Sequence, residues 1–380
     1  MADEPIGGAR EIDSDEFIAP ALRDLLLAGA SLPHARVETT VLHRPEPDGY
    51  RYSHHPHIAR YAGWYLAMWS SGIEREDRPG QRVLWARSRD GASWTEPETL
   101  MECPPAPWRL TAGGWASDRG RLFAFVNRSR REDQPSLKAG CKWYPPLYVD
   151  IIEAGDDLAW GPPRTVDADF LTNESPRRTA AGTWLLAGES ARHEAGVLRS
   201  APGPDADFQF LPFPRVAIPR PPEKPERWTP PLRPLGEPSW YQWPDGTIVC
   251  FLRDDHASGR LFVTESDDDG FTWSVPRATE IPDAKAKSAA LALSDGRVVL
   301  VSNAVPDRRR GAMAVLVAHD GMRFDRAAIL RDETTAPRLR AGLPGYQYPS
   351  VLEHDGRLWV IHSVNKEDIA VTSLALGDLP

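Results

Sequence analysis

The stretch DGTIVCFLR, residues 245–253, places a glycine turn directly before a run of apolar and β-branched residues. The same pattern occurs six times along the chain, with its glycine at Gly63, Gly120, Gly182, Gly246, Gly296 and Gly356. Subtraction gives separations of 57, 62, 64, 50 and 60 residues. Glycine suits a hairpin turn because it adopts positive φ without steric cost. Regular units of several short strands are typical of propeller blades, so we predict an all-β fold, a six-bladed β-propeller.

Prolines support the same arrangement. Pro56, Pro176, Pro238 and Pro349 precede four of the repeat glycines by 7, 6, 8 and 7 residues. Proline cannot donate a hydrogen bond to a strand ladder and is tolerated at a sheet edge. The innermost strand of a propeller blade is such an edge, because it borders the central channel. We therefore expect the residues around these prolines to converge on the channel.

The segments outside the repeats suggest the domain organisation. We expect residues 1–35 to form an N-terminal extension with a short helix that is interrupted or begins at Pro20, with Asp13 and Glu16 spaced as a capping box. Residues 36–380 are expected to form a single propeller domain. Ten prolines within 212–238 predict an irregular connection between blades, at about 212–236. A strand over 369–376 could close the ring with the N-terminal segment.

Composition limits the classes of function. The 380 residues are 41% hydrophobic and 26% charged, which allows a large core, and a net charge of −9 disfavours nucleic acid or an anionic membrane as partner. Cys103, Cys141 and Cys250 form no CxxC pair, so neither a disulfide framework nor a thiolate zinc site is indicated. The first residues lack the features of a signal peptide. We expect a cytoplasmic protein, or a secreted one if a leader precedes this sequence; the oligomeric state is open.

The expected channel positions carry polar and aromatic residues. They are His54, His55, His57, Arg177, Glu237, Trp240, Arg253, Tyr346 and Tyr348. Aromatic rings stack on sugars, and an arginine binds a carboxylate bidentately. We expect a net-basic mouth that binds an acidic oligosaccharide or glycoconjugate. The alternative for any one of these residues is an ordinary solvated position in a loop.

Two turns combine a cluster of Ser, Asp and Gly with a tryptophan: SRDGASW (88–94) and SDDDGFTW (266–273), and AHDGMRF (318–324) is a degraded third copy. These turns resemble the Asp boxes of sialidases and related BNR-repeat propellers. In that family the box lies on the rim, away from the active site. The resemblance therefore implies that Asp90 and Asp268 stabilise turns and take no part in catalysis.

The order of residues in the second half also resembles that of a sialidase. The runs that carry the resemblance are EPSWYQWPDGTIVCFLRDD (237–255) and YQYPSVLEHDGRLWVIHS (346–363). The resemblance implies that Glu237 deprotonates the nucleophile Tyr348. It also implies that Arg253 binds a substrate carboxylate together with one of Arg308, Arg309 and Arg310, of which we select Arg310.

The first repeat departs from the family. Sialidases carry an Arg-Ile-Pro motif there, whose arginine helps to hold the carboxylate of sialic acid, whereas Pro56 is preceded by His54 and His55. A neutral imidazole cannot replace a bidentate guanidinium group. This departure argues against true sialidase activity.

The stretch SHHPHI, residues 53–58, leaves three interpretations open. In a regular strand His55 and His57 share one face, where they could bind a metal with Glu237 or Asp77. Proton transfer fits better, because imidazole titrates near neutral pH. Hydrogen bonding to substrate is the third interpretation. We predict no resident metal and no cofactor.

Three functions are therefore considered. In the preferred one, the protein hydrolyses a glycosidic bond of an acidic glycan: Glu237 activates Tyr348, and His55 or the loop with Glu76 and Asp77 protonates the leaving oxygen. The second is β-elimination at a uronic acid with His and Tyr as acid and base, and the third is a non-catalytic glycan-binding propeller. The sugar, the linkage and exo or endo action stay open.

Overall fold

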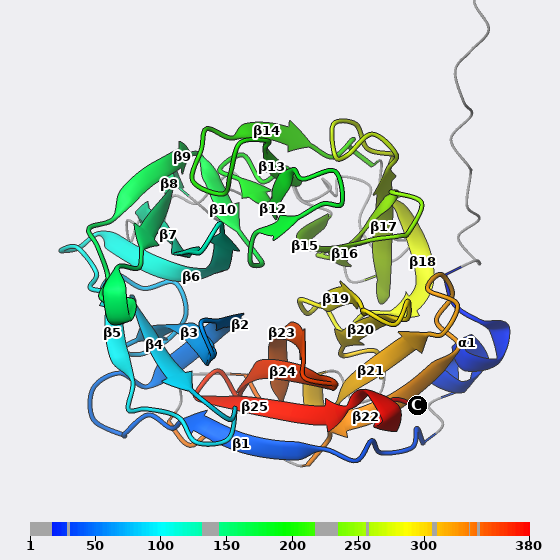
Figure 1. Ribbon diagram of the computed structural model, residues 1–380. Helices are drawn as coiled ribbons and strands as arrows, with labels where there is room; N and C mark the ends of the chain where they lie inside the picture. The colour runs from blue at the N-terminus through cyan, green and yellow to red at the C-terminus, as the bar shows by residue number, and fades with distance from the viewer. Residues whose placement is uncertain are drawn as a thin grey trace, which may run out of the picture.

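The computed structural model describes residues 17–28, 31–130, 144–216, 235–255, 258–305, 310–333, 335–339 and 343–380. Six separate antiparallel sheets surround a central channel, as Figure 1 shows. The predicted six-bladed β-propeller is confirmed.

The first three sheets follow chain order from the channel outward. The first contains β2 (Tyr52–Tyr61), β3 (Trp64–Gly72), β4 (Arg82–Ser88) and β5 (Glu98–Met101). The second contains β6 (Trp108–Asp118), β7 (Arg121–Arg130), β8 (Tyr144–Glu153) and β9 (Arg164–Ala168). The third contains β10 (Phe170–Thr172), β11 (Arg177–Arg178), β12 (Trp184–Ser190), β13 (Ala195–Ser200) and β14 (Gln209–Pro212). Here two short strands, β10 and β11, both pair with β12.

The last three sheets repeat the pattern. The fourth contains β15 (Leu235–Gln242), β16 (Ile248–Asp254), β17 (Arg260–Ser266) and β18 (Arg277–Pro282). The fifth contains β19 (Ala289–Ala292), β20 (Val298–Ser302), β21 (Met313–Ala318) and β22 (Arg326–Arg331). The sixth contains β23 (Tyr346–His354), β24 (Arg357–Val364), β25 (Asp368–Ala375) and, as its outer strand, β1 (Glu38–His43).

The two ends of the chain close the ring. β1 pairs antiparallel with β25, as the blue and red strands at the bottom of Figure 1 show. The expected closing strand is thus present, and its partner comes from the N-terminal side. This pairing joins the two ends of the chain within the sixth blade and so closes the ring.

The repeat glycines lie where the sequence places them. Each stands between a channel-facing strand and the next strand of its sheet, with φ between +67° and +100°. An L-residue with a side chain rarely adopts this conformation, which explains why glycine recurs.

The Asp boxes form turns between the third and fourth strands of their sheets. Asp90 Oδ1 accepts hydrogen bonds from the backbone of Ala92 and Ser93 at 2.9 and 2.7 Å, and Trp94 Nε1 donates to the carbonyl of Gly91 at 3.0 Å. These amide groups lower the pKa of Asp90 to about 2. Asp268 accepts a bond from Thr272 N in the same way, at 2.8 Å.

The N-terminal helix packs on the outside of the ring. α1 (Pro20–Leu27) begins at Pro20, a residue suited to the first helical position because it lacks an N–H. Leu22 and Leu26 are buried in a core cluster with Val249 of β16 and Leu300 of β20. The capping box at Asp13 and Glu16, Cys141, and residues 217–234 of the Pro-rich connection lie outside the described residues. In the described ranges no helix has the length and apolar character that a bilayer crossing needs.

Beta-bulges interrupt the innermost strands at the channel. The register shifts between His54 and His57 in β2, between Gly236 and Ser239 in β15, and between Gln347 and Ser350 in β23. β6 has a comparable shift between Ala112 and Gly114. A bulge adds an unpaired residue and redirects its side chain, so these strands do not follow simple alternation.

Candidate active site

Tyr348, Glu237 and Arg253 form the centre of a buried polar cluster. The Tyr348 hydroxyl donates a hydrogen bond to Glu237 Oε1. Arg253 Nη1 donates to Tyr348 Oη at 3.0 Å and lies 2.5 Å from Glu237 Oε1. Nε and Nη2 of Arg253 bond Asp255 Oδ1 at 3.0 and 2.6 Å. The side chain of Arg253 is only 7% exposed. Its guanidinium group is held by three neighbours, Tyr348, Glu237 and Asp255.

The backbone at these residues is unusual. His55, Glu237 and Tyr348 each directly precede a proline and have φ of +54°, +48° and +57°. Positive φ is uncommon outside glycine, and the strain costs about 1–3 kcal/mol per residue. All three are the extra residues of the bulges in β2, β15 and β23, and all three line one cavity. The strained conformation thus coincides with the cavity.

Charges around Tyr348 fix its protonation. Burial raises the pKa of Tyr348 well above its ordinary value, the negative charge of Glu237 raises it further, and Arg253 opposes them. Burial alone would lower the pKa of Arg253, but its acidic neighbours, Glu237 first and Asp255 among the others, together outweigh burial and hold the pKa well above normal. At neutral pH the phenol is therefore neutral beside a permanently charged guanidinium. Removing its proton requires a base in contact, and Glu237 is in contact.

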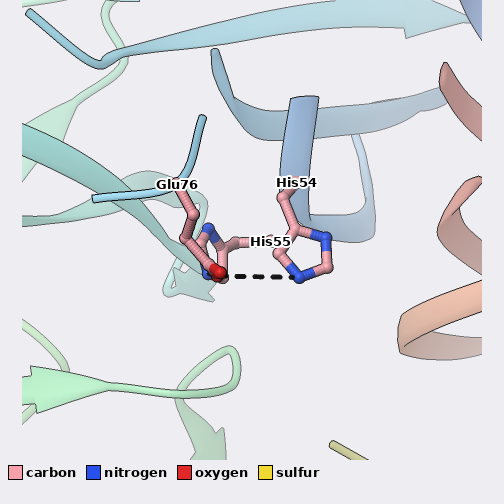
Figure 2. Close-up of side chains that lie close together, drawn as sticks. All are labelled: His54, His55 and Glu76. Carbon is pink, nitrogen blue, oxygen red and sulfur yellow. Dashed lines mark ion pairs between the residues drawn. The ribbon is translucent and has the colours of Figure 1, made fainter. Parts of the chain in front are cut away.

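The side chains of His54, His55 and Glu76 lie close together, as Figure 2 shows. This group lies next to Tyr348. His55 Nε2 lies 3.2 Å and His54 Nε2 lies 3.9 Å from Glu76 Oε1. The ring centroids of His54 and His55 are 4.1 and 5.3 Å from that of Tyr348. Lys366, between β24 and β25, donates to Glu76 Oε2.

Both histidines are oriented from behind by serines. His54 Nδ1 lies 2.6 Å from Ser363 Oγ, and His55 Nδ1 lies 3.1 Å from Ser70 Oγ. Burial, then the charge of Lys366, hold the pKa of His54 well below its usual value. Burial alone would raise the pKa of Glu76, but Lys366 and the histidines hold it well below normal. Glu76 is therefore an ionised carboxylate that faces neutral His54.

The expected pairing of His55 with His57 on one face does not occur. The bulge between His54 and His57 breaks the alternation of β2, so the rings of His54 and His55 are neighbours, and His57 lines the same cavity at another position. His57 Nδ1 lies 3.4 Å from Ser175 Oγ, and burial holds its pKa well below normal. Asp77 also lines the cavity, and its carboxylate pairs with buried Arg109 Nη1 at 2.9 Å.

The cavity between the inner strands differs in charge from the expected net-basic mouth. It is lined by His55, His57 and Tyr348, by two cationic residues, Arg253 and Lys287, and by five acidic residues. The acidic residues are Glu76, Asp77, Glu189, Glu237 and Asp255. The difference arises because several predicted basic and aromatic residues take other positions.

Four of the proposed substrate-binding residues lie away from this cavity or only beside it. Arg177 stacks on the ring of buried Trp240 at 4.5 Å and lines a second cavity further along the channel. Tyr346 donates to Glu333 Oε2 at 2.6 Å. Arg310 donates to Gln347 Oε1 at 2.6 Å and lines a separate hollow. Arg308 and Arg309 lie outside the described residues.

Sequence reasoning did not single out three residues that hold the site together. Asp255 bonds Arg253, Lys366 bonds Glu76, and Glu189 Oε1 accepts the backbone N–H of Glu237 at 3.0 Å. Asp255 follows Arg253 by two residues at the end of one strand, which is a usable signal. Lys366 and Glu189 reach the site only through tertiary structure.

The pattern of the whole chain identifies its family. Residues 63–360 match the family model of the BNR repeat-like domain, which is most of the chain. The chain belongs to the BNR repeat-like domain family. This membership agrees with the Asp boxes and with the six blades. A comparison with curated proteins finds no match for this BNR repeat-like protein.

Solved structures show the same fold. A sialidase is 19% identical with a TM-score of 0.62, and the match covers 97% of this chain and 35% of that one. Trypanosoma rangeli sialidase in complex with sialic acid is 14% identical, with a TM-score of 0.66 and coverage of 92% and 60%. A Dyadobacter fermentans protein of unknown function is 16% identical, with a TM-score of 0.65 and coverage of 90% and 100%.

These likenesses concern the fold. The BNR repeat-like protein spans about a third of the first sialidase and three fifths of the second. At such identities the likeness shows that the sialidases have the same propeller fold as this protein. It does not assign their substrates to this protein.

Proposed function

We propose that this BNR repeat-like protein is a glycoside hydrolase of the sialidase type, with Tyr348 as nucleophile and Glu237 as its base. The observation that carries the proposal is the hydrogen bond from the Tyr348 hydroxyl to Glu237 Oε1 at the edge of a cavity. A neutral phenol is a poor nucleophile, so it needs an adjacent base. Sialidases are the glycosidases in which tyrosine has this role.

The first step forms a glycosyl–tyrosine bond. As Tyr348 Oη attacks the anomeric carbon, its proton passes to Glu237 and the bond to the leaving oxygen breaks. Arg253 Nη1, 3.0 Å from Oη, stabilises the negative charge that develops on the phenolic oxygen. His55 and Asp77, which both line the cavity, are the candidates to protonate the leaving oxygen. In the second step water attacks the anomeric carbon and gives a proton back to the residue that had protonated the leaving oxygen. The bond between the sugar and Tyr348 breaks, and the released phenolate recovers its proton from Glu237.

The substrate is proposed to carry a carboxylate. Among the described residues, Arg253 is the one predicted carboxylate-binding arginine that lines the cavity, and its Nε and Nη2 contact Asp255. A substrate carboxylate would exchange with the Asp255 carboxylate on this guanidinium. The structural neighbours include a sialidase in complex with sialic acid, which is an acidic sugar. The alternative is a neutral glycan as substrate, and the panel below compares the two.

A substrate panel tests the proposal. Aryl glycosides of sialic, glucuronic and galacturonic acid, and of neutral sugars, are incubated with the wild-type protein and with Tyr348→Phe. We expect hydrolysis of an acidic glycoside and a loss of at least about 10³-fold in Tyr348→Phe. The matched control, Tyr346→Phe, removes a hydroxyl bonded to Glu333 outside the cavity and should retain activity. Full activity in Tyr348→Phe would rule out the nucleophile.

The ring contacts of His54 and His55 with Tyr348 favour β-elimination as a second candidate. In that reaction a Tyr or His side chain removes the proton next to the carboxylate of a uronic acid and another group protonates the departing oxygen. Elimination leaves a double bond conjugated with the carboxylate. Ultraviolet absorbance of the product from an acidic oligosaccharide therefore separates the two reactions. Binding without turnover of any substrate would favour the non-catalytic propeller.

A further inference from the structure

We propose that His54, His55 and Glu76 form a site for a divalent transition metal of the zinc class, and that the ion binds the carboxylate of the substrate. The first half of this inference stands on the three side chains alone. The second half rests on the proposed function, because it requires an acidic sugar in the cavity. The two halves are tested separately.

The ligand atoms have suitable spacing. One atom from each residue can be chosen so that all lie within 4.8 Å of one another, and Glu76 Oε1 is 3.2 and 3.9 Å from the two Nε2 atoms (Figure 2). Ligands about 2.0–2.2 Å from a tetrahedral zinc ion are about 3.3–3.6 Å apart. Small side-chain rotations would bring the three atoms to that spacing. Three protein ligands with one open position are typical of catalytic zinc sites.

A buried lone pair points into the site. The Ser363 hydroxyl donates its hydrogen to the carbonyl of Gln347 at 3.3 Å, so Ser363 Oγ accepts from His54 Nδ1–H at 2.6 Å. His54 Nε2 is then unprotonated. It is fully buried, has no hydrogen-bond partner among the described residues, and faces Glu76 Oε1. A fully buried lone pair that faces a carboxylate oxygen is unfavourable, and a cation bound between the two atoms would satisfy both.

The surroundings suit a bound cation. Ser363 and Ser70 fix the rings of His54 and His55 through Nδ1, as outer hydrogen bonds do for histidines that bind metals. Lys366 bonds Glu76 Oε2, which leaves Oε1 for the ion. Five acidic side chains line the cavity against Arg253 and Lys287, and they still exceed the cationic residues by one when Lys366 and Arg109, the partners of Glu76 and Asp77, are counted.

The donor atoms select the class of ion and suggest its role. Two imidazoles and one carboxylate suit zinc, copper or nickel, whereas calcium and magnesium prefer oxygen ligands alone. His55 and Glu76 line the cavity, so the open position of the ion faces the substrate. Because His55 cannot donate a proton while it binds the ion, Asp77 is then the candidate to protonate the leaving oxygen. His54 and His55 precede Pro56, where sialidases have the arginine of Arg-Ile-Pro. In this protein the ion would supply the positive charge that the arginine of Arg-Ile-Pro supplies to the carboxylate in sialidases.

Direct titration tests the metal site without substrate. Chelator-treated protein is titrated calorimetrically with ZnCl₂, CaCl₂ or MgCl₂, and with CoCl₂ while the visible spectrum is recorded. We expect one equivalent of zinc, no calcium or magnesium, and the intense visible bands of tetrahedral cobalt. His54→Gln and Glu76→Gln should each weaken zinc binding by at least about 100-fold.

An exposed histidine supplies the matched control. His34 Nε2 lies 3.0 Å from Asp332 Oδ1, and His34→Gln should leave the zinc affinity unchanged. If His54→Gln fails to fold, the zinc affinity of Glu76→Gln and the cobalt spectrum of the wild type still test the metal site. The absence of one-to-one zinc binding, or equal affinity in a folded Glu76→Gln variant, would overturn the metal site.

The carboxylate contact is tested by binding and not by turnover. Sialic acid and glucuronic acid, and their methyl esters, are titrated into zinc-loaded and chelated protein. We expect zinc to tighten the binding of at least one free acid by about tenfold or more and to leave its ester unchanged. Equal affinities with and without zinc would overturn the carboxylate role only. Failure of the glycoside panel, by contrast, would remove the proposed hydrolysis and leave the metal titration to stand.

Discussion

Tyr348 donates a hydrogen bond to Glu237, although 111 residues separate them in the sequence. Both residues precede a proline, both have positive φ, and both are the extra residue of a bulge on an innermost strand. Because proline cannot complete the ladder, each bulge turns one side chain towards the channel. The fold thus builds an acid–base pair by using the same local device in two blades.

Replacing Glu237 should slow the chemical step. Glu237→Gln keeps the size of the side chain but cannot accept the proton of Tyr348 as a carboxylate does. We expect kcat on the best substrate to fall by about 10²–10⁴-fold. Glu265→Gln, which removes a carboxylate of β17 that pairs with Arg277, should keep kcat within a few-fold. Steady-state kinetics of both variants measure these values. Equal kcat values for Glu237→Gln and Glu265→Gln would argue against Glu237 as the base.

Removing Arg253 should destabilise the protein. Arg253→Met leaves Glu237 and Asp255 without their shared guanidinium partner in a buried place. We expect the free energy of unfolding to fall by about 3–5 kcal/mol. The control Arg215→Met removes the exposed partner of Glu194 and should change it by less than about 1 kcal/mol. Urea unfolding of the variants measures both values, and a loss below about 1 kcal/mol for Arg253→Met would contradict this account of the cluster.

Asp283 should make stability depend on pH. Burial raises the pKa of Asp283 from 3.8 to about 6, although the backbone N–H groups of Asp254 and Ala286 oppose the change. The folded protein therefore holds this proton more tightly than the unfolded chain. The associated stability is present below pH 3.8 and is lost as pH rises through 6. About two pKa units correspond to about 3 kcal/mol.

The variant Asp283→Asn isolates this contribution because it does not titrate. Between pH 4 and pH 7 the free energy of unfolding of the wild type should fall by about 3 kcal/mol relative to that of the variant. Urea unfolding at several pH values gives this difference. A difference that stays constant across the range would mean that Asp283 titrates normally.

The Asp boxes should affect stability without affecting chemistry. Asp90→Ala removes the acceptor of two backbone hydrogen bonds in the turn, and we expect a loss of about 1–2 kcal/mol. Because the turn lies between β4 and β5, on the outer side of the sheet, KM and kcat measured well below the melting temperature should match the wild type. A tenfold loss of kcat in a folded variant would assign the box a part in catalysis.

The sequence allowed the fold and the meeting of distant residues to be predicted. Six glycine turns fix the number of blades, and the prolines near Gly63, Gly246 and Gly356 mark strands that do border the channel. Pairing of β15 with β16 places Glu237 near Arg253, and the ring of blades brings Tyr348 of β23 to the same channel. These inferences depend on strand order, which a repeat pattern fixes.

Side-chain direction at the bulges could not be predicted. Alternation in a regular strand puts His55 with His57, but the left-handed conformation of His55 brings it beside His54 instead. The residue types of His55, Glu237 and Tyr348 do not predict positive φ, because residues other than glycine rarely adopt it. The contact of Lys366 with Glu76 joins loops 290 residues apart and has no local signal.

The nucleophile is tested most directly by trapping it. A fluorinated acidic glycosyl donor, matched to the substrate that the panel identifies, slows breakdown of a covalent intermediate. Mass spectrometry of the digested protein should then find one equivalent of sugar on the peptide that contains Tyr348, and no adduct in Tyr348→Phe. Turnover of the substrate with an adduct on another residue, or with no adduct and an ultraviolet-absorbing unsaturated product, would contradict Tyr348 as the nucleophile.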